Sequence, residues 1–374
     1  MRTMFWVSAA VIVYAYVGYP VWLWLHSWWS PWPVLRGPGL PPVSAVMVVR
    51  NEESAIARKL ENLLTLDYPA EKLEVVTVSD GSSDGTEMAL AEFERQDPRV
   101  RVVAKQASKG KAAGLNDAIA LARGEILLFT DARQQIEPGA LRFLIENFGD
   151  PQVGAASGEL MLGDPASGET AKGMGLYWRI EKKIRELESA SGSVAGATGA
   201  IYCARRALLD PLPEGTILDD VLLPMQVVRR GGRVIFDSRA RAWDSPDLGE
   251  SREFSRKVRT LSGNYQLLQL APWLLSSANA IRFEFISHKL SRLIVPFALL
   301  GLLIASIFLP GPFYRVALGT QIAFYVLSLV ALGGIEVGPL SRLADAARTF
   351  VVLNSAALMA FVNFVTGRKT VWVR

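Results

Sequence analysis

Polar side chains stand directly after three hydrophobic, β-branched runs in the first third of the chain. Asn51 and Glu52 follow the first run, Asp80 follows the second, and Asp131 follows the third. Carboxylates and amides bind ligand hydroxyls, hold hard cations or accept protons. Chance readily explains one acid in a loop but explains three such positions poorly, so these residues predict a shared polar site.

Two further groups of residues could carry chemistry. Lys109 and Lys111 flank Gly110 before a helical pattern, and ammonium and N–H groups at a helix N-terminus stabilise a diphosphate. Farther along, Asp219 and Asp220 are adjacent. If their carboxyls approach each other, the like charge raises the pKa of one of them. The alternative is that Asp219 faces solvent or caps the following helix.

The elements that must position these residues alternate between strand and helix patterns. The sequence predicts strands at 43–49, 73–78, 100–104 and 125–129, and helices at 54–66, 87–95 and 112–123. This order predicts an α/β fold with a mostly parallel sheet and helices on both faces. Ligands of such sheets bind beyond the carboxyl ends of the strands, which is where the polar positions lie.

Uncharged runs flank this domain on both sides. They cover 3–35, 293–314, 316–335 and 349–367, and each is long enough to cross about 30 Å of hydrocarbon as a helix. Half of the residues are hydrophobic and the mean hydropathy is +0.23, unusually high for a soluble protein. Tryptophans clustered before residue 33 suit the headgroup layer, so the first run is predicted to be a retained anchor rather than a signal peptide.

The composition excludes several classes of protein. Only Glu336 and Asp345 among the acidic residues lie outside 36–292, so the central domain is nearly neutral and the net charge of +4 comes from the flanking segments. A nucleic-acid-binding face is therefore not expected. The single cysteine, Cys203, excludes an internal disulfide and suits the core, and two histidines argue against a zinc site.

These patterns predict an ordered series of segments. They are a transmembrane helix at 4–29, a proline-stiffened linker, a central domain at 36–265, interfacial amphipathic helices at 266–292 and two or three spans in 293–374. An ordinary domain-packing helix is the alternative for 266–292. The central domain should be cytoplasmic, on the inner face of the cell membrane, because more basic residues follow the first span than precede it.

The number of C-terminal spans stays open. Three spans after the central domain would place Arg368, Lys369 and Arg374 outside the cell, against the positive-inside rule. One C-terminal run is therefore expected to be re-entrant or interfacial. Pro296 and Pro310 make the first of these runs the candidate.

Several sequence strings resemble a known enzyme family. They are VSAVMVVRNEE at 43–53, VSDGSSDGT at 78–86 and KGKAAGLN at 109–116, together with DAR at 131–133, GATGA at 196–200 and ILDDV at 217–221. They resemble the inverting family 2 glycosyltransferases with a GT-A fold, in the membrane-bound branch that includes cellulose, chitin and hyaluronan synthases. The resemblance covers nearly the whole chain.

The resemblance implies roles on the donor side. Asn51 and Glu52 would contact the nucleotide, Asp80 its base, and Lys109 and Lys111 its diphosphate. Asp131 would face the ribose and diphosphate and hold Mg²⁺ or Mn²⁺. Arg133 departs from the family's Asp-x-Asp, because arginine cannot bind a metal. Three readings stay open: Asp131 and the phosphates hold the ion, Arg133 itself pairs with phosphate, or donor chemistry is lost.

The resemblance also implies an acceptor side. Thr198, Gly199 and Ala200 would form the turn that carries the acceptor, with a plain tight turn as the alternative. Asp220 would be the general base, with Asp219 beside it. Processive relatives continue with Gln-x-x-Arg-Trp. Here Arg259 matches the arginine and would bind diphosphate, while Arg256 replaces the glutamine and Thr260 the tryptophan that stacks on the acceptor. The lost stacking weakens the case for a long polymer, and a solvated basic helix is the alternative.

The expected function is transfer of a sugar from a nucleotide-diphosphate donor, expected to be UDP-linked, to a membrane-associated polysaccharide or glycolipid acceptor. Two alternatives are kept. One is a polyprenyl-phosphate sugar synthase, whose acceptor needs no strong base. The other is a catalytically silent, nucleotide-binding subunit of a polysaccharide export complex, which would act with a membrane partner subunit.

Overall fold

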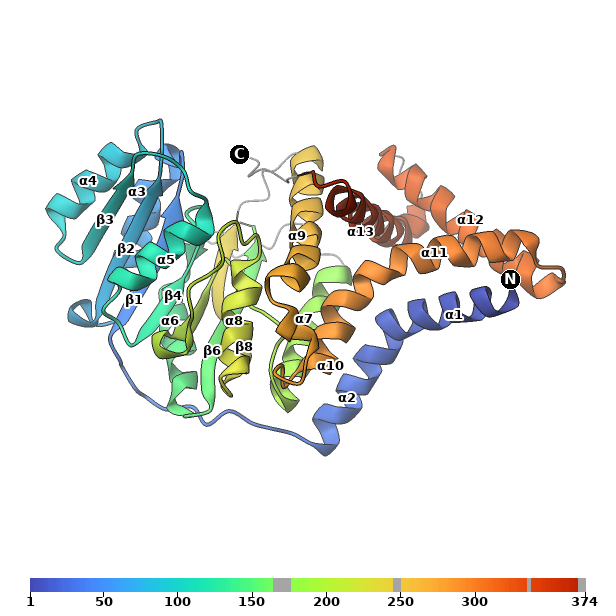
Figure 1. Ribbon diagram of the computed structural model, residues 1–374, viewed down its shortest axis with the longest axis horizontal. Helices are drawn as coiled ribbons and strands as arrows, with labels where there is room; N and C mark the ends of the chain where they lie inside the picture. Colours follow the sequence, from blue (N-terminus) through green and yellow to red (C-terminus); the bar gives the residue numbers. More distant parts are fainter. Residues whose placement is uncertain (164–175, 245–249, 335–337, 369–374) are drawn as a thin grey trace.

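The computed structural model describes residues 1–163, 176–244, 250–334 and 338–368. An α/β domain lies at one end of the molecule, and long apolar helices extend from its other side (Figure 1). The region beyond β2 and β3 is farthest from these helices. The two parts meet along α7, α9 and α10, so any site between them borders both the sheet and the apolar helices.

The domain is built on an eight-stranded sheet with the order β3-β2-β1-β4-β7-β6-β8-β5. The strands are β1 (Val43–Val49), β2 (Leu73–Asp80), β3 (Val100–Lys105), β4 (Ile126–Phe129), β5 (Gln135–Ile136), β6 (Val153–Leu162), β7 (Tyr202–Arg205) and β8 (Arg233–Asp244). The first four strands are mutually parallel, as the sequence predicts. The second half is mixed, because β7 runs antiparallel to both β4 and β6 and β5 runs antiparallel to β8.

Helices cover both faces of this sheet. They are α3 (Glu53–Leu64), α4 (Thr86–Gln96), α5 (Lys111–Leu121), α6 (Ala140–Glu146), α7 (Leu176–Ser191), α8 (Asp219–Arg229) and α9 (Glu250–Leu270), with short 3-10 turns at 70–72, 147–149, 206–208, 272–275 and 338–340. Every residue of β1 is buried. Because alternate side chains point to opposite faces, Val46 and Val48 pack in the core that includes α5 and α8, while Ala45 and Met47 pack in the core that includes α3 and α6.

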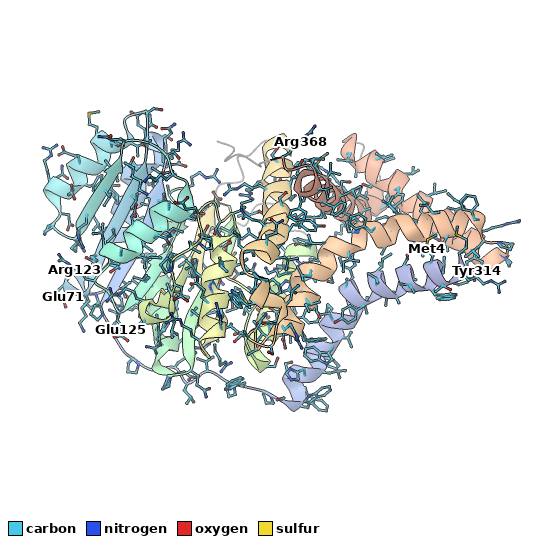
Figure 2. All side chains as sticks on the ribbon, viewed as in Figure 1. Met4, Glu71, Arg123, Glu125, Tyr314 and Arg368 are labelled. Atoms are coloured by element: carbon cyan, nitrogen blue, oxygen red, sulfur yellow. The ribbon has the colours of Figure 1, made fainter. Side chains whose placement is uncertain are left out.

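Four helices within the described ranges are long and apolar enough to cross a membrane, at Arg2–Trp29, Arg282–Phe308, Pro312–Leu332 and Ser341–Val365. The first comprises α1 (Arg2–Val13), the π-helical turn η1 (Tyr14–Gly18) and α2 (Tyr19–Trp29); the second comprises α10 (Arg282–Phe285), the π-helical turn η6 (Ile286–Leu290) and α11 (Ser291–Phe308); the others are α12 (Pro312–Leu332) and α13 (Ser341–Val365). Met4 and Tyr314 meet in one apolar cluster at the end opposite Arg123 and Glu125 (Figure 2).

The start and the end of the segment predicted at 266–292 both fall inside helices of the structure. The segment 266–292 is the end of α9, a short turn and the start of the helix that continues to Phe308. That helix runs through Pro296 without a break. A proline removes one backbone hydrogen bond, and the flanking turns continue the helix on either side. Cys203 is fully buried and free, as expected.

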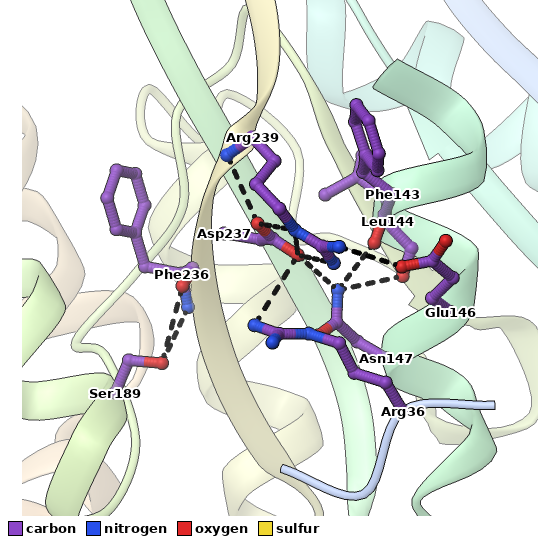
Figure 3. Close-up of polar contacts among 9 residues, drawn as sticks. All are labelled: Arg36, Phe143, Leu144, Glu146, Asn147, Ser189, Phe236, Asp237 and Arg239. Atoms are coloured by element: carbon purple, nitrogen blue, oxygen red, sulfur yellow. Dashed lines mark hydrogen bonds and ion pairs between the residues drawn. The ribbon is translucent and has the colours of Figure 1, made fainter. Parts of the chain in front are cut away.

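The linker before β1 is docked on the domain. Asp237 in β8 is buried and accepts hydrogen bonds from Arg239 Nη2 at 2.7 Å and Asn147 Nδ2 at 2.9 Å (Figure 3). Arg36 in the linker lies 3.8 Å from the same carboxylate. Nearby, the guanidinium of Arg233 lies 4.2 Å above the ring of Trp32. These contacts fix the direction in which the first apolar helix leaves the domain.

A buried ionic cluster joins the domain to the apolar helices. His288 in η6 has Nδ1 at 2.8 Å from Glu188 Oε1 and Nε2 at 3.2 Å from Glu181 Oε1, both in α7. Tyr19 donates to Glu188 at 2.6 Å, and Arg292 lies 2.7 Å from Glu181. Breaking one partner of such a cluster leaves a buried charge uncompensated, so these pairs hold the helices to the domain in one orientation.

Candidate active site

Three of the predicted charged residues meet at the carboxyl end of β4. Asp131 follows β4, Asp219 opens α8, and Lys111 opens α5. The Nζ atom of Lys111 lies 2.9 Å from Asp131 Oδ1 and 3.1 Å from Asp219 Oδ2. Burial disfavours the charged lysine, but the two carboxylates outweigh it and raise the pKa of Lys111. An ammonium group therefore links the predicted donor and base sides of the site.

The Asp220 carboxylate lies beside the predicted acceptor turn. Its Oδ2 atom accepts a hydrogen bond from the Gly199 N–H at 3.2 Å. Burial, followed by the charge of Asp219, raises the pKa of Asp220 to about 6. A carboxylate with that pKa is mostly ionised at neutral pH and is still basic enough to accept a proton. The expected pKa effect of the Asp219–Asp220 pair is therefore present.

The turn at 196–200 frames this carboxylate. Its Ala197 N–H donates to the Asp220 carbonyl at 2.7 Å, and its Thr198 N–H donates to Ser157 Oγ at 3.1 Å. A methyl group at Gly199 would lie 3.5 Å from both Asp131 Oδ2 and Asp220 Oδ2. The carboxylates of Asp131 and Asp220 therefore both face Gly199. Ala200 is buried: its side chain packs in the core that includes α3 and α6, and its carbonyl accepts a hydrogen bond from Thr130 Oγ1 at 2.8 Å.

Asp80 orders the glycine- and lysine-containing turn on the donor side. Its Oδ1 accepts from the Lys109 N–H at 2.9 Å, and its Oδ2 accepts from Ser108 Oγ at 2.6 Å and from the Gly110 N–H at 2.9 Å. Burial opposes ionisation, but these hydrogen bonds together hold the pKa of Asp80 below its usual value. The carboxylate is thus a structural anchor for this turn, whatever ligand it also contacts.

Asn51 and Glu52 stand where β1 meets the loop after β2. Asn51 has φ 54°, in the left-handed region that asparagine tolerates, and its Oδ1 accepts from the Ser83 N–H at 2.8 Å. Glu52 is half-buried. Burial raises its pKa, and the charges of Arg133 and Asp131 both act on it. Glu52 therefore belongs to the same electrostatic environment as Asp131.

The donor set around Asp131 allows one protein ligand to a divalent cation. Within the described ranges, no group of three or more His, Cys, Asp or Glu side chains could hold a metal ion. Arg133 lies 3.9 Å from Asp244, while Asp131 is 41% exposed at the side chain and binds Lys111 through Oδ1. Because Mg²⁺ commonly binds one or two carboxylates together with phosphates and water, Asp131 Oδ2 fits that ligand role.

Helix α9 brings Arg259 to the site and holds the loop before Asp219. The charge of Arg259 acts on Asp219, Asp131 and Asp220, whereas that of Arg256 acts on Glu253 and Thr260 is exposed. Gln266 accepts from the Ile217 N–H at 2.9 Å and donates to the Gly215 carbonyl at 2.8 Å. Of the three residues predicted on this helix, only Arg259 thus has a described electrostatic interaction with the three aspartates.

Lys59 and Gln266 support the site but were not among the predicted residues. Lys59 is fully buried and donates to Thr130 Oγ1 at 2.8 Å and to the Gln134 carbonyl at 2.7 Å. Burial lowers the pKa of Lys59 to about 7. The pattern that could have indicated a buried lysine is its position on the same helix face as Ile56 and Leu63. Gln266 had no such signal, because its partners are backbone groups of a distant loop.

Comparison with known proteins agrees with this architecture. Residues 44–211 match the family model "Glycosyl transferase family 2". A beta-monoglucosyldiacylglycerol synthase of Trichormus variabilis is 30% identical over 193 residues, covering 50% of this chain and 41% of the relative. A poly-beta-1,6-N-acetyl-D-glucosamine synthase of Staphylococcus aureus is 24% identical over 238 residues, covering 61% and 56%. The chain thus matches about half the length of these relatives.

A solved structure shares the fold over almost the whole chain. It is a mannosyltransferase from Pyrobaculum calidifontis, determined with GDP-mannose and Mn²⁺, with a TM-score of 0.77 and 22% identity, covering 98% of this chain and 100% of that one. At this identity the likeness supports the fold alone. The chain therefore has the GT-A fold, and its residues 44–211 match the model of glycosyltransferase family 2.

Proposed function

We propose that this protein transfers a sugar, with inversion at C1, from a nucleotide-diphosphate donor to a hydroxyl group of a membrane-associated acceptor. The observation that carries the proposal is the Asp220 carboxylate, whose pKa is raised to about 6 and which faces Gly199 together with Asp131. The apolar helices beside the site support a lipid-linked or polysaccharide acceptor presented at the membrane. The donor is expected to be a UDP-sugar.

In this reaction Asp220 Oδ2 takes the proton of the acceptor hydroxyl. The acceptor oxygen forms its bond to C1 of the sugar while the bond from C1 to the diphosphate oxygen breaks, and the electron pair leaves on the diphosphate. The Gly199 N–H orients the base by donating to Oδ2. Lys111 and Arg259 supply positive charge close to the leaving group, where it stabilises the transition state more than the ground state.

The donor is expected to lie along the carboxyl ends of β1, β2 and β4. Asn51, Glu52 and Asp80 would contact the nucleotide, and the ordered turn at 108–110 would present N–H groups and Lys109 to the diphosphate. Asp131 Oδ2 would hold Mg²⁺ or Mn²⁺, which supplies charge neutralisation when bound. Arg133, close to Glu52 and Asp244, would face a donor phosphate from the other side.

The acceptor is expected to approach from the side of the apolar helices, along the turn at Thr198–Ala200 and α9. The location proposed for the protein is the inner cell membrane, with the glycosyltransferase domain in the cytoplasm. Its topology can be checked by cysteine labelling from either side of sealed vesicles at Arg123→Cys in the domain and at Arg315→Cys in the first turn of α12. Labelling of both sites from the same side would contradict this placement.

The experiment that tests the function uses the purified full chain in nanodiscs. The chain is incubated with UDP-, GDP- and dTDP-sugars, with and without added lipid acceptor, and products are identified by mass spectrometry. One donor should give a glycolipid or an oligosaccharide series, and EDTA in excess should reduce its formation. Nucleotide binding without any product from any donor would contradict the proposal and favour a silent nucleotide-binding subunit.

A further inference from the structure

Lys289 is a cation without a partner in the helix that enters the membrane. It lies in η6, inside the apolar helix Arg282–Phe308. Its neighbours His288 and Arg292 are both paired with carboxylates of α7. Among the residues that the structure describes, Lys289 makes no hydrogen bond or ion pair, although its side chain is only partly exposed.

A lysine in this environment lowers the stability of the protein unless its charge is compensated. An ammonium group that is partly removed from water and lacks a counter-charge destabilises the protein unless a ligand supplies that charge. Ionisable residues within membrane helices therefore mark binding sites for ions or substrates. The charges of Glu181 and Glu188 act on Lys289 but are opposed there by those of Arg185 and Arg292, and both carboxylates are already engaged by His288 and its neighbours.

The position of Lys289 relates it to the base. Phe285 and Leu290, from the same turns, pack in the core that includes Leu218 and Val221 on either side of the Asp219–Asp220 pair. The charge of Lys289 acts on Asp220. Lys111 also acts on Asp220, but that lysine is already bound by Asp131 and Asp219. Lys289 is therefore a cation whose charge reaches the base and which has no hydrogen-bond or ion-pair partner among the described residues, so an incoming anion can bind it.

We propose that Lys289 binds a phosphate group that a substrate brings to the membrane side of Asp220. The phosphate comes either from the donor diphosphate or from the headgroup of an acceptor lipid, and both offer the same anionic oxygens to the ammonium. The proposal rests on the function proposed above, because it places this subsite next to the base. Arg259, whose charge acts on the same three acids from α9, adds positive potential on the approach.

The test compares Lys289→Gln and Lys289→Arg with Lys183→Gln as the control. Lys183 is also a lysine near this junction, but it lies on the outer side of α7, is 62% exposed at the side chain and pairs with Glu186. The affinity of UDP and GDP is measured by calorimetry in nanodiscs. Retention of lipid is measured with nanodiscs that contain a polyprenyl phosphate, or dioleoylglycerol as a neutral lipid.

Lys289→Gln should weaken one phosphate-bearing ligand about ten- to a hundredfold, the range for a lost charge-assisted hydrogen bond. Weakened UDP or GDP assigns the subsite to the donor, and weakened polyprenyl phosphate assigns it to the lipid. Lys289→Arg should keep most of the affinity, and dioleoylglycerol should be unaffected. Loss of affinity no greater than in Lys183→Gln, for both kinds of ligand, would overturn the proposal.

A measurement on the unaltered chain covers the case in which Lys289→Gln does not fold. Reductive methylation of Lys289, followed by mass spectrometry, should be suppressed by the phosphate-bearing ligand that the subsite binds. Equal methylation in the presence of UDP, GDP, polyprenyl phosphate or no ligand would overturn the proposal. Protection without sugar transfer would count against the proposed function only, whereas sugar transfer without protection would count against this subsite only.

Discussion

The donor side and the base side of the site differ in how completely their polar groups are paired. On the donor side, Asp80 accepts three hydrogen bonds and Asn51 bridges two loops. On the base side, Asp220 accepts one N–H, Lys289 is without a described partner, and the buried Tyr202 hydroxyl has no partner among the described residues. On the described contacts, the predicted donor side is thus more completely paired than the predicted base side.

The difference fits the tasks of the two sides. A binding surface for a nucleotide gains affinity from groups already held in place. A base must keep a raised pKa, which needs burial and an unneutralised like charge rather than full pairing. The base side therefore keeps polar groups that are not fully paired, while the hydrogen bonds of the donor side help to order the fold. The predictions that follow test this contrast.

Replacing Asp220 with asparagine should have the largest effect. Asp220→Asn keeps the side-chain shape and can still accept the Gly199 N–H bond, but it cannot take a proton. We expect the turnover number to fall about a thousandfold, within the range for a lost general base, with nucleotide affinity unchanged by calorimetry. A loss of less than tenfold would indicate an acceptor that is already anionic, such as a polyprenyl phosphate.

The pH dependence should come from the base side alone. Because Asp220 must be ionised to act and its pKa is about 6, kcat/KM should fall about tenfold for each pH unit below 6 and level off above it. Asp80, whose pKa is held below its usual value, should stay ionised through this range. The contribution of Asp80 to nucleotide affinity, measured by calorimetry as the ratio of the affinities of the unaltered chain and Asp80→Ala, should therefore be the same at pH 7 and pH 5, and loss of this ratio in parallel with kcat/KM would contradict the contrast.

Removing the anchor on the donor side should act on nucleotide affinity. Asp80→Ala leaves Ser108 Oγ and the Lys109 and Gly110 N–H groups without their acceptor, so the turn loses its order. We expect UDP or GDP affinity to fall about ten- to a hundredfold. Asp84→Ala is the matched control, since Asp84 caps the same loop farther from the site. Equal losses in the two variants would refute a specific role for Asp80.

The support from α9 should act on the base side. Gln266→Leu removes two hydrogen bonds to the loop at 215–217, so the position of Asp220 becomes less defined. We expect kcat to fall about tenfold with the donor KM unchanged. Gln266→Glu, which keeps the acceptor for the Ile217 N–H, should recover part of the activity. Gln269→Leu, on the exposed side of the same helix, should behave as the unaltered protein.

The smallest effect is expected for an unpaired hydroxyl on the base side. Tyr202→Phe removes a buried hydroxyl that has no described partner, so the free energy of unfolding should stay the same or rise by up to about 1 kcal/mol. Tyr68→Phe, which removes a hydrogen bond to the Pro41 carbonyl, should lower it by about 1 kcal/mol. Thermal unfolding in detergent measures both, and a larger loss for Tyr202→Phe would contradict the contrast.

Local patterns were sufficient for the first half of the domain. The four strands to residue 129 and the helices between them have the predicted order and pairing, because β1, β2 and β4 are buried almost throughout and read as hydrophobic runs. The edge strand β3 is mostly half-buried and was indicated by its β-branched residues. The antiparallel β7 and the long β6 and β8 were not predicted. Their residues alternate small, polar and charged types, and the partners that pair with them lie far away in the sequence.

The sequence by itself determined which side chains could do chemistry: the acids after β1, β2 and β4, the aspartate pair, and the lysines before α5. Only the tertiary structure decided that Lys111 joins Asp131 to Asp219, that Gln266 holds the loop before Asp219, and that the charge of Lys289, which has no partner among the described residues, acts on Asp220. The reason is physical. Residue types and local periodicity can be read directly along the chain. Charge pairing and pKa values depend on burial and on distances between segments that only folding brings together.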